Sequence, residues 1–310
     1  MLTADHRQPS ALMAWRHACR LRTLPLAAAC ILVGAGLAWL DGGGRWVITG
    51  LALLTTVLLQ VLANLANDYG DTLHGADGPL RIGPPRAVQQ GWISVCAMRR
   101  AIVCCGGLAA FSGLSLLLLA WPQLVGWGLW FWPLAGLLAI VAALTYTLGP
   151  RPYAYAGLGD LAVLVFFGLL GTLGSYALQA PSAPRWPWLP ALALGLLSVG
   201  VLNLNNLRDW QADAAAAKRT LVVRLGVPAG RYYQCLLVVA ADLLWLGQLL
   251  LREGRWMVLP LLVLPLHVRL LQRVWHVPLA QLDAELPRLA KLTLLQALLL
   301  IVGAWLDTRF

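Results

Sequence analysis

Two short segments rich in aspartate and asparagine carry the side chains that could do chemistry. Residues 64–71 read Asn-Leu-Ala-Asn-Asp-Tyr-Gly-Asp, and Asp77 follows them. Residues 203–213 read Asn-Leu-Asn-Asn-Leu-Arg-Asp-Trp-Gln-Ala-Asp. Each segment closes a long apolar stretch, and together with Asp77 they hold five of the 13 acidic residues of the chain. Carboxylates near hydrocarbon cost about 2.5–3.5 kcal/mol each on insertion scales, so their concentration here indicates function.

The spacing within each segment places polar side chains on one helical face. Residues three or four apart are neighbours on an α-helix, so Asn67 aligns with Asp71, and Asn205 aligns with Asp209 and Asp213. Clustered carboxylates repel one another unless a cation intervenes. Mg²⁺ takes carboxylate and amide oxygens and bridges substrate phosphates, so two facing clusters would hold a diphosphate between metal ions. The candidate ligands are Asn67, Asp68, Asp71, Asp77, Asn205, Asp209 and Asp213.

Basic residues follow both segments. Arg81 and Arg86 come after the first, and Lys218 and Arg219 come after the second. They could bind phosphate oxygens, for which arginine offers a planar, two-pronged donor. The alternative is that they only mark membrane topology. For the acidic segments the alternative is helix capping and polar loop chemistry, which explains one segment more easily than two matched ones.

The elements that must position these residues are membrane helices. The chain has 310 residues, 60% hydrophobic and 12% charged, with a mean hydropathy of +0.73. Soluble domains carry about 25% charged residues, so lipid is the expected solvent. Spans need about 20 mainly apolar residues, which predicts an all-α integral membrane protein with nine transmembrane helices. The windows are 23–40, 46–66, 101–120, 126–148, 158–178, 188–206, 233–251, 256–273 and 289–306.

The net charge of +10 follows the pattern expected for a membrane protein and is not taken as a sign of nucleic-acid binding. With the N-terminus inside, 18 of the 23 Lys and Arg residues fall on the cytoplasmic side. Both acidic segments lie on that side, so the active site is expected to face the cytoplasm. The six cysteines and five histidines show no metal-binding spacing.

One polytopic domain is expected. Residues 1–22 form a cytoplasmic N-terminal segment, and residues 23–310 form the membrane domain. A cleaved signal peptide is the alternative for the first apolar run, but the leader is long and no clear cleavage site follows it.

The residues now described resemble the UbiA superfamily of membrane prenyltransferases, and most closely its branch that acts on 1,4-dihydroxy-2-naphthoate in menaquinone synthesis. The likeness covers the chain from about residue 20 onward. Ala217 stands where that branch usually has glycine, and Pro85 where leucine is expected. The matching stretches are 67–71 (Asn-Asp-Tyr-Gly-Asp), 75–77 (Gly-Ala-Asp), 81–84 (Arg-Ile-Gly-Pro), 89–91 (Gln-Gln-Gly), 146–149 (Tyr-Thr-Leu-Gly), 151–153 (Arg-Pro-Tyr), 157–160 (Gly-Leu-Gly-Asp), 206–209 (Asn-Leu-Arg-Asp), Asp213 and 218–221 (Lys-Arg-Thr-Leu).

The resemblance implies a UbiA-type bundle in the inner (cytoplasmic) membrane and a reaction between a polyprenyl diphosphate and an aromatic acid. Mg²⁺ is the implied cofactor, held around the catalytic Asp68, Asp71, Asp209 and Asp213. The electron-rich ring attacks an allylic cation, and carbon dioxide and diphosphate leave, giving demethylmenaquinol. Diphosphate is assigned to Arg81, Arg86, Lys218 and Arg219, and the acceptor or prenyl chain to Asn67, Tyr69, Tyr146, Asp160 and Asn206.

Three other interpretations stay open. Acceptor choice rests on a few contacts, so 4-hydroxybenzoate or homogentisate is an alternative, although the stretch 81–84 argues against it. A transporter also carries intramembrane polar residues, but it usually places them near the bilayer midplane and not at helix ends. A purely structural membrane subunit is the third, and the paired acidic segments argue against it.

Overall fold

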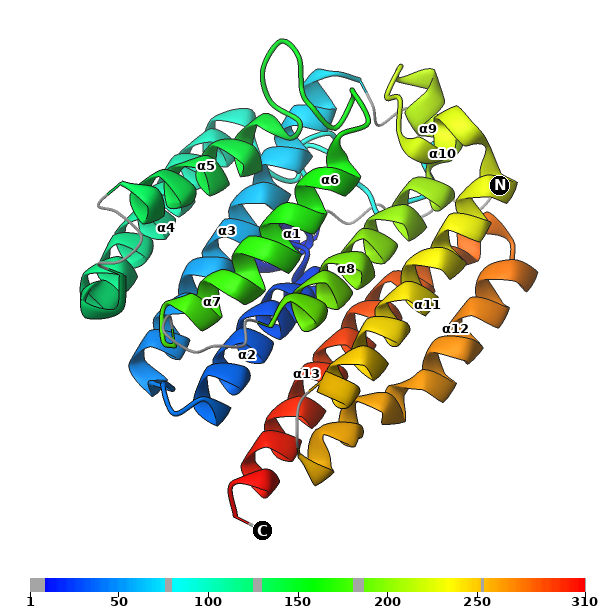
Figure 1. Ribbon diagram of the computed structural model, residues 1–310. Coiled ribbons are helices and arrows are strands. Elements are labelled where there is room, and N and C mark those ends of the chain that lie inside the picture. Colours follow the sequence, from blue (N-terminus) through cyan, green and yellow to red (C-terminus); the bar gives the residue numbers. More distant parts are fainter. Residues whose placement is uncertain (1–8, 76–79, 125–129, 181–186, 252–253, 310) are drawn as a thin grey trace.

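A computed structural model describes residues 9–75, 80–124, 130–180, 187–251 and 254–309, and all secondary structure in these ranges is helical (Figure 1). The first part comprises α1 (Ala11–Cys19), η1 (Leu21–Thr23), α2 (Leu24–Leu40), α3 (Trp46–Leu73), α4 (Val95–Leu124) and α5 (Phe131–Thr145). The middle part comprises α6 (Gly159–Val163), the π-helix η3 (Leu164–Leu173), α7 (Gly174–Ala177), α8 (Trp188–Arg208), α9 (Trp210–Ala215) and α10 (Leu221–Leu225). The last part comprises α11 (Val227–Leu251), η4 (Arg255–Val263), α12 (Leu264–His276), η5 (Leu279–Ala284) and α13 (Glu285–Asp307).

Eight helical segments of the described chain are long and apolar enough to cross a membrane. They match eight of the nine predicted windows. The exception is the window 126–148, which yields α5 with only 15 residues, short of the roughly 20 that a straight span needs. Residues 126–129 of that window lie outside the described ranges. The first spanning segment also begins earlier than predicted, because α1 and η1 lead directly into α2 over Ala11–Leu40.

The surface of the bundle is apolar where a soluble protein would be polar. On α4, Val103, Phe111 and Leu118 are 73%, 72% and 66% exposed. Side chains of this kind are stable in such positions only when hydrocarbon surrounds them, as in a bilayer. The outer face of α4 is therefore a lipid-facing surface.

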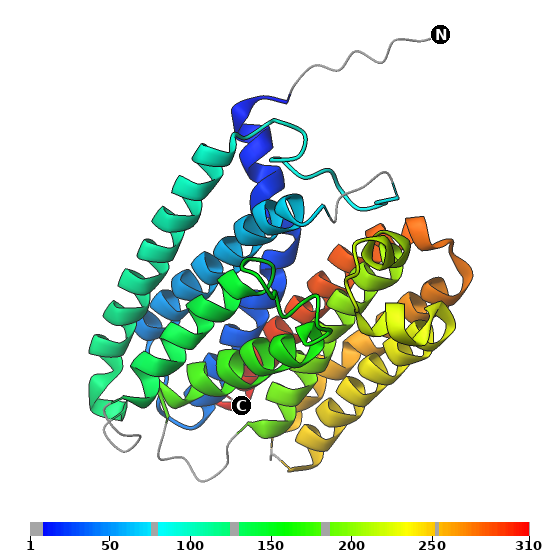
Figure 2. The same cartoon turned by 90° about the horizontal axis from the view of Figure 1, so that it is seen from above.

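Helices from distant parts of the sequence share one large apolar core. α8 packs against α11 and η3, α13 packs against α2, and α3 packs against α4. In both views the teal α4 and the orange α12 lie on opposite sides of the bundle (Figures 1 and 2). The largest buried cluster joins α2, α8, α11 and α13 through side chains that include Leu37, Leu194, Leu204, Trp245, Leu289 and Leu300. This core fixes the end of α8, and a separate apolar cluster of α1, α3 and α4 side chains packs around the end of α3.

The contact between η3 and α8 depends on two glycines. A Cβ atom added to Gly168 of η3 would lie 2.7 Å from the carbonyl oxygen of Ala191 and 2.8 Å from the Cα atom of Gly195. Real Cβ atoms do not approach backbone atoms so closely. The two helices therefore pack backbone to backbone at this crossing, as small residues allow in membranes.

We predict that Gly168→Ala destabilises the protein by about 1–3 kcal/mol, because the added methyl group forces η3 away from α8. The matched control is Gly107→Ala on α4, where an added Cβ meets no atom within 4 Å. There the change only favours the helix, by about 0.5–1 kcal/mol. Thermal unfolding midpoints in detergent would show a lower value for the first variant and an equal or higher value for the second. Equal midpoints for the two variants would contradict the packing argument.

Candidate active site

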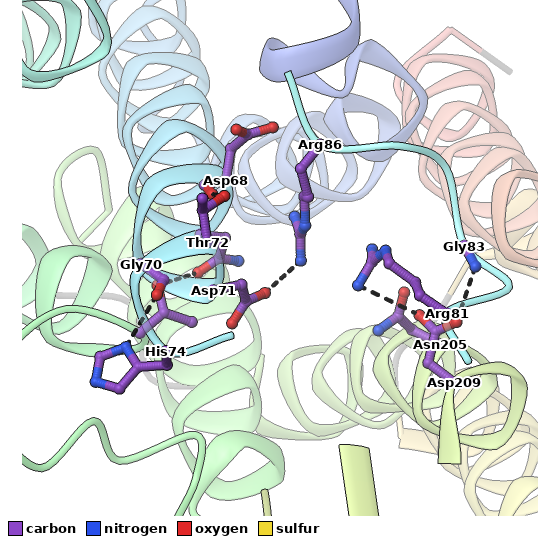
Figure 3. Close-up of polar contacts among 12 residues, drawn as sticks. Asp68, Gly70, Asp71, Thr72, His74, Arg81, Gly83, Arg86, Asn205 and Asp209 are labelled. Carbon is purple, nitrogen blue, oxygen red and sulfur yellow. Dashed lines mark hydrogen bonds and ion pairs between the residues drawn. The ribbon is translucent and has the colours of Figure 1, made fainter. Parts of the chain in front are cut away.

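The two acidic segments come together at one end of the bundle. Asp68 and Asp71 lie in the last turns of α3, and Asp209 is the C-cap residue of α8. All three carboxylates are buried. Figure 3 shows the segment of residues 80–88, here called the bridging loop, passing between the two helix ends.

The bridging loop is bound to the first acidic segment by charge and by backbone. The N–H groups of Ala87 and Val88 donate to the two oxygens of Asp68, at 2.9 and 3.0 Å. The Arg86 guanidinium forms an ion pair with Asp71 (Figure 3). Arg86 is itself buried, so each charge compensates the other away from water. Asp68 therefore holds the loop, and Asp71 holds its one buried arginine.

The same loop is bound to the second acidic segment. The N–H group of Gly83 donates to Asp209 Oδ1 at 2.9 Å, and Arg81 Nη1 lies 3.9 Å from Asp209 Oδ2 (Figure 3). A Cβ atom on Gly83 would lie 2.4 Å from Arg208 Nη2, so any side chain at this position would displace the Arg208 guanidinium. The Arg-Ile-Gly-Pro stretch is thus the part of the bridging loop that contacts the second acidic segment.

Arg208 organises the second segment, and sequence reasoning missed it. Its guanidinium is only 1% exposed, and it donates to Asp209 and, at 2.7 Å, to Asn205 Oδ1. It also pairs with Asp283 of η5, which Arg22 binds from the other side at 2.9 Å. Burial alone would raise the pKa of Asp209. The hydrogen bond and charge of Arg208, with Arg81 and the Gly83 N–H, outweigh burial and lower that pKa.

Asn205, Asp209 and Asp213 follow one another with the hydrogen bonds of a helix, as their spacing predicted. They do not lie in one continuous helix. The N–H of Asp209 donates to the Asn205 carbonyl at 3.0 Å, and the N–H of Asp213 donates to the Asp209 carbonyl at 2.9 Å. The α-helix nevertheless breaks at Asp209, and Asp213 lies in the short helix α9. The break lets the chain turn while Asp213 keeps its place near the other carboxylates.

Lys218 and Tyr155 link the two segments directly. Lys218 Nζ lies 3.5 Å from Asp213 Oδ1 and 5.7 Å from the centre of the Tyr155 ring. The Tyr155 hydroxyl donates to Asp71 Oδ1 at 3.2 Å. Burial would lower the pKa of Lys218, but the charges of Asp71 and Asp213 outweigh it and raise that pKa. One lysine therefore compensates the charge of a carboxylate from each segment.

Asp213 is the least compensated carboxylate of the site. Burial raises its pKa to about 6, and the negative charges of Asp209 and Asp71 add to that rise against the opposing Lys218. Its Oδ2 atom is buried with no hydrogen-bond partner among the described residues. A carboxylate oxygen of this kind, near two further carboxylates and the Asn205 amide, suits a hard divalent cation.

The side chains are not gathered as a closed metal cage. No three His, Cys, Asp or Glu side chains in the described ranges are close enough to one another to form a metal site. The reason is visible in the contacts, since Asp68, Asp71 and Asp209 are already bound to N–H groups or arginines. The donor set fits Mg²⁺ that arrives together with phosphate oxygens, which complete its coordination.

The other predicted side chains are less central. The Asn67 amide oxygen accepts from Thr147 Oγ1 at 3.1 Å, and Asn206 is buried in α8. Tyr69 packs in the apolar cluster shared by α1, α3 and α4. Arg219 is exposed, and its backbone N–H donates to the Tyr155 carbonyl at 3.1 Å. Asp77 lies outside the described residues.

Tyr146 and Asp160 lie on the inner side of the site. The Tyr146 ring packs edge-on against Tyr153 at 5.3 Å, and Lys218 lies within electrostatic range of its hydroxyl. Asp160 forms a hydrogen bond with Tyr233 of α11. Asp160 lies in the first turn of α6, whose N-cap residue is Leu158.

Arg20 is a second cation that sequence reasoning missed. It lies between α1 and η1 in a left-handed conformation, with a φ of 47°. Its guanidinium is within electrostatic range of Asp68, Asp71 and Arg81. No spacing pattern pointed to it, because it precedes the first acidic segment by more than 40 residues.

The helical bundle and its paired acidic segments define a membrane protein with a polar, phosphate-suited site at one end. The model of the UbiA prenyltransferase family matches residues 27–295, and the chain belongs to that family. The resemblance stated from the sequence is thereby confirmed, and the chain is a multi-pass membrane enzyme.

Relatives and solved structures agree with this assignment. A protein of Escherichia coli (strain K12) named 1,4-dihydroxy-2-naphthoate octaprenyltransferase is 46% identical over 304 residues, which is 97% of this chain and 98% of that protein. A Mycobacterium tuberculosis protein of the same name is 40% identical, covering 82% of this chain and 84% of its own length.

Two solved structures share the fold. A UbiA homolog from Aeropyrum pernix K1 has a TM-score of 0.67 at 17% identity, covering 94% of this chain and 98% of its own. A UbiA homolog from Archaeoglobus fulgidus, bound to GPP and Mg²⁺, has a TM-score of 0.60 at 16% identity, covering 93% and 99%.

The residue before Lys218 has a strained backbone conformation. Ala217 has a φ of 54°, a left-handed conformation that costs a residue with a side chain about 1–2 kcal/mol. Ala217→Gly should therefore raise the free energy of unfolding by about 1 kcal/mol. The matched control is Ala216→Gly, where φ is −86° and glycine should destabilise by about 0.5–1 kcal/mol. Opposite shifts of the thermal midpoint are expected, and a fall for both variants would contradict the argument.

Proposed function

We propose that this chain transfers a polyprenyl group from polyprenyl diphosphate to 1,4-dihydroxy-2-naphthoate. The C–O bond to the diphosphate breaks, and a C–C bond to the ring forms. The carboxylate leaves as carbon dioxide and its bonding electrons return to the ring, so demethylmenaquinol forms without an external oxidant or reductant. The observation that carries the proposal is the joining of the two acidic segments through Lys218. The names of relatives at 40–47% identity support the acceptor.

The proposed metal ligands are the two acidic segments. Asp71, Asp209 and Asp213 would hold Mg²⁺ with the amide oxygens of Asn67 and Asn205, and the ion would neutralise the negative charge of the leaving diphosphate. Each Asp68 oxygen already accepts one loop N–H group, so only its remaining lone pairs would be available to the ion. Its first role is to hold the bridging loop. Asp77 is retained as a candidate ligand from its sequence position alone.

The diphosphate is proposed to lie between the bridging loop and Lys218. Arg81 and Arg86 approach from the loop, and Lys218 lies opposite them between Asp71 and Asp213. When phosphate oxygens are present, these cations stabilise the charge that develops on the leaving group. Arg219 is exposed at the rim, where it would attract an anionic substrate more than it would bind it.

The prenyl cation and the acceptor are assigned to the inner side of the site. The faces of Tyr146 and Tyr155 would stabilise an allylic cation next to the diphosphate. Tyr69, partly buried against the apolar cluster of α1, α3 and α4, is the weaker candidate for that role. Asp160 and Asn206 are proposed to orient the acceptor. The long prenyl chain would leave the site between lipid-facing helices.

The proposed topology places the site on the cytoplasmic side of the inner membrane. The nine-span arrangement requires α5 to cross together with residues next to it, with the N-terminus and residues 1–22 in the cytoplasm. The excess of Lys and Arg on that side supports this orientation. The charges of the site lie at helix ends and not at the bilayer midplane, which favours an enzyme over a transporter.

We predict that Asp71→Ala lowers the rate of prenyl transfer at least about a hundredfold, because the diphosphate loses a cation ligand. Asp209→Asn should do the same, and asparagine keeps a hydrogen-bond acceptor at this position for the buried Arg208. The control is Asp307→Ala at the far end of α13, which should keep wild-type turnover. All variants are first checked for intact folding by thermal midpoint. Near-normal turnover by folded Asp71→Ala protein would contradict the assignment.

Metal dependence and acceptor choice can be measured together by mass spectrometry. Purified protein receives a polyprenyl diphosphate and either 1,4-dihydroxy-2-naphthoate or 4-hydroxybenzoate, with Mg²⁺ or with EDTA. A decarboxylated, prenylated naphthoquinol is expected only with Mg²⁺ and the naphthoate. Product only with the benzoate would keep the diphosphate chemistry and overturn the acceptor. No product with either acceptor, at several donor lengths, would overturn the enzyme proposal.

A further inference from the structure

A second polar site lies outside the acidic segments, between α12 and α13. Two adjoining open hollows of about 350 and 380 Å³ share Arg269 and Arg273 in their walls. Together we call them the α12–α13 pocket. Its polar lining is Arg269, Gln272, Arg273, His276 and Arg288, and its apolar lining is Leu266, Leu270, Val277 and Leu292.

The pocket carries a surplus of positive charge. The Glu285 side chain is fully buried, and Arg273 Nε and Arg288 Nη1 both donate to it, at 2.6 and 2.5 Å. One arginine would suffice to neutralise that carboxylate. The two arginines remain 48% and 44% exposed, so their outer N–H groups face the pocket and its surroundings. Arg269 adds a third positive charge and forms no ion pair within the described ranges, which leaves a surplus of two.

Neighbouring groups do not cancel this charge. Arg231 of α11 donates to the carbonyl oxygens of Trp275 and Val277, at 3.0 and 3.1 Å, and so adds a further cation at the end of α12. His276 Nδ1 contacts the Gln272 carbonyl oxygen at 2.6 Å. The nearest other carboxylate in the sequence, Asp283, is already shared by Arg22 and Arg208. The pocket is therefore suited to an anion.

The position of the pocket indicates which anion. α12 ends and α13 begins at the same end of the bundle as the acidic segments, because Asp283 of η5, between them, contacts Arg208 at the end of α8. Figure 1 shows the orange α12 along the outer edge of the bundle, with its C-terminal end at this side. The arginines thus lie near headgroup depth. Leu266 and Leu292 lie further along their helices, toward the hydrocarbon.

We propose that the α12–α13 pocket binds one anionic phospholipid. Arg269, Arg273 and Arg288 bind the headgroup phosphate, for which guanidinium groups offer paired donors. An acyl chain follows the apolar wall formed by Leu266, Leu270 and Leu292. Basic pockets between membrane helices on the positively charged side recognise lipid headgroups in this way. A free phosphate or diphosphate would use the arginines but would gain nothing from the leucine wall.

The proposal can be tested by native mass spectrometry of the full chain in detergent. Delipidated protein is titrated with phosphatidylglycerol, with phosphatidylcholine of the same acyl chains, and with inorganic diphosphate. The test variant is Arg269→Gln, because this arginine does not support Glu285. The matched control is the change Arg99→Gln on α4, an exposed arginine near the start of a helix on the opposite side of the bundle.

Wild-type protein should retain one phosphatidylglycerol at least about fivefold more tightly than phosphatidylcholine, and Arg269→Gln should weaken that binding about fivefold. The control variant should bind as the wild type does. A further change, Arg288→Gln added to Arg269→Gln, should weaken it again if the double variant folds. Equal binding of the two lipids would overturn the proposal, as would equal loss in the Arg99→Gln control. Displacement of the lipid by inorganic diphosphate would overturn the lipid assignment in favour of a free anion.

Discussion

Carboxylates buried at the ends of apolar helices stay ionised only where cations or N–H donors compensate them, since desolvation penalises the charged form. In this protein one loop supplies many of these cations and N–H donors. The bridging loop gives two backbone N–H groups to Asp68, an arginine to Asp71, and a backbone N–H group and a second arginine to Asp209. Because α3 and α8 are far apart in sequence, these contacts also fix the distance between the two halves of the site. The same contacts therefore compensate the buried charges and hold the two helix ends in place.

The sequence predicted features that depend on a regular spacing of residues or on a local concentration of one residue type. Long apolar stretches predicted the helices, and the spacing of Asp68, Asp71, Asp209 and Asp213 predicted side chains that meet at one end of the bundle. The bridging loop has no regular spacing of residue types. Its Arg81 and Arg86 were nevertheless identified, because basic residues beside an acidic cluster indicate a phosphate-binding site. The partner of each arginine was not predictable. Geometry decides that Arg86 pairs with Asp71 and that Arg81 reaches across to Asp209.

The residues that sequence reasoning missed share one property, which is that their role depends on a distant contact. Arg208 adjoins Asp209 in sequence, but its burial and its pairing with Asp283 of η5 appear only when α13 is packed beside α8. Tyr155 lies in a connection that has no motif of its own, and Arg20 precedes the first spanning helix. The shortness of α5 was missed for a related reason, since hydropathy reports how apolar a stretch is but not where its helix ends.

The ion pair between Arg86 and Asp71 has a consequence for turnover. It is an internal competitor, because the carboxylate that would hold a metal ion and the guanidinium that would hold a phosphate satisfy one another. With the proposed metal and diphosphate contacts, binding of the donor would exchange this pair for two others, and the apparent affinity for the diphosphate group would fall with the fraction of molecules in which the pair is open. The same competition acts on the released diphosphate, whose departure is assisted when the pair closes again. An enzyme with this arrangement gives up tight binding of its donor and gains relief from inhibition by its product.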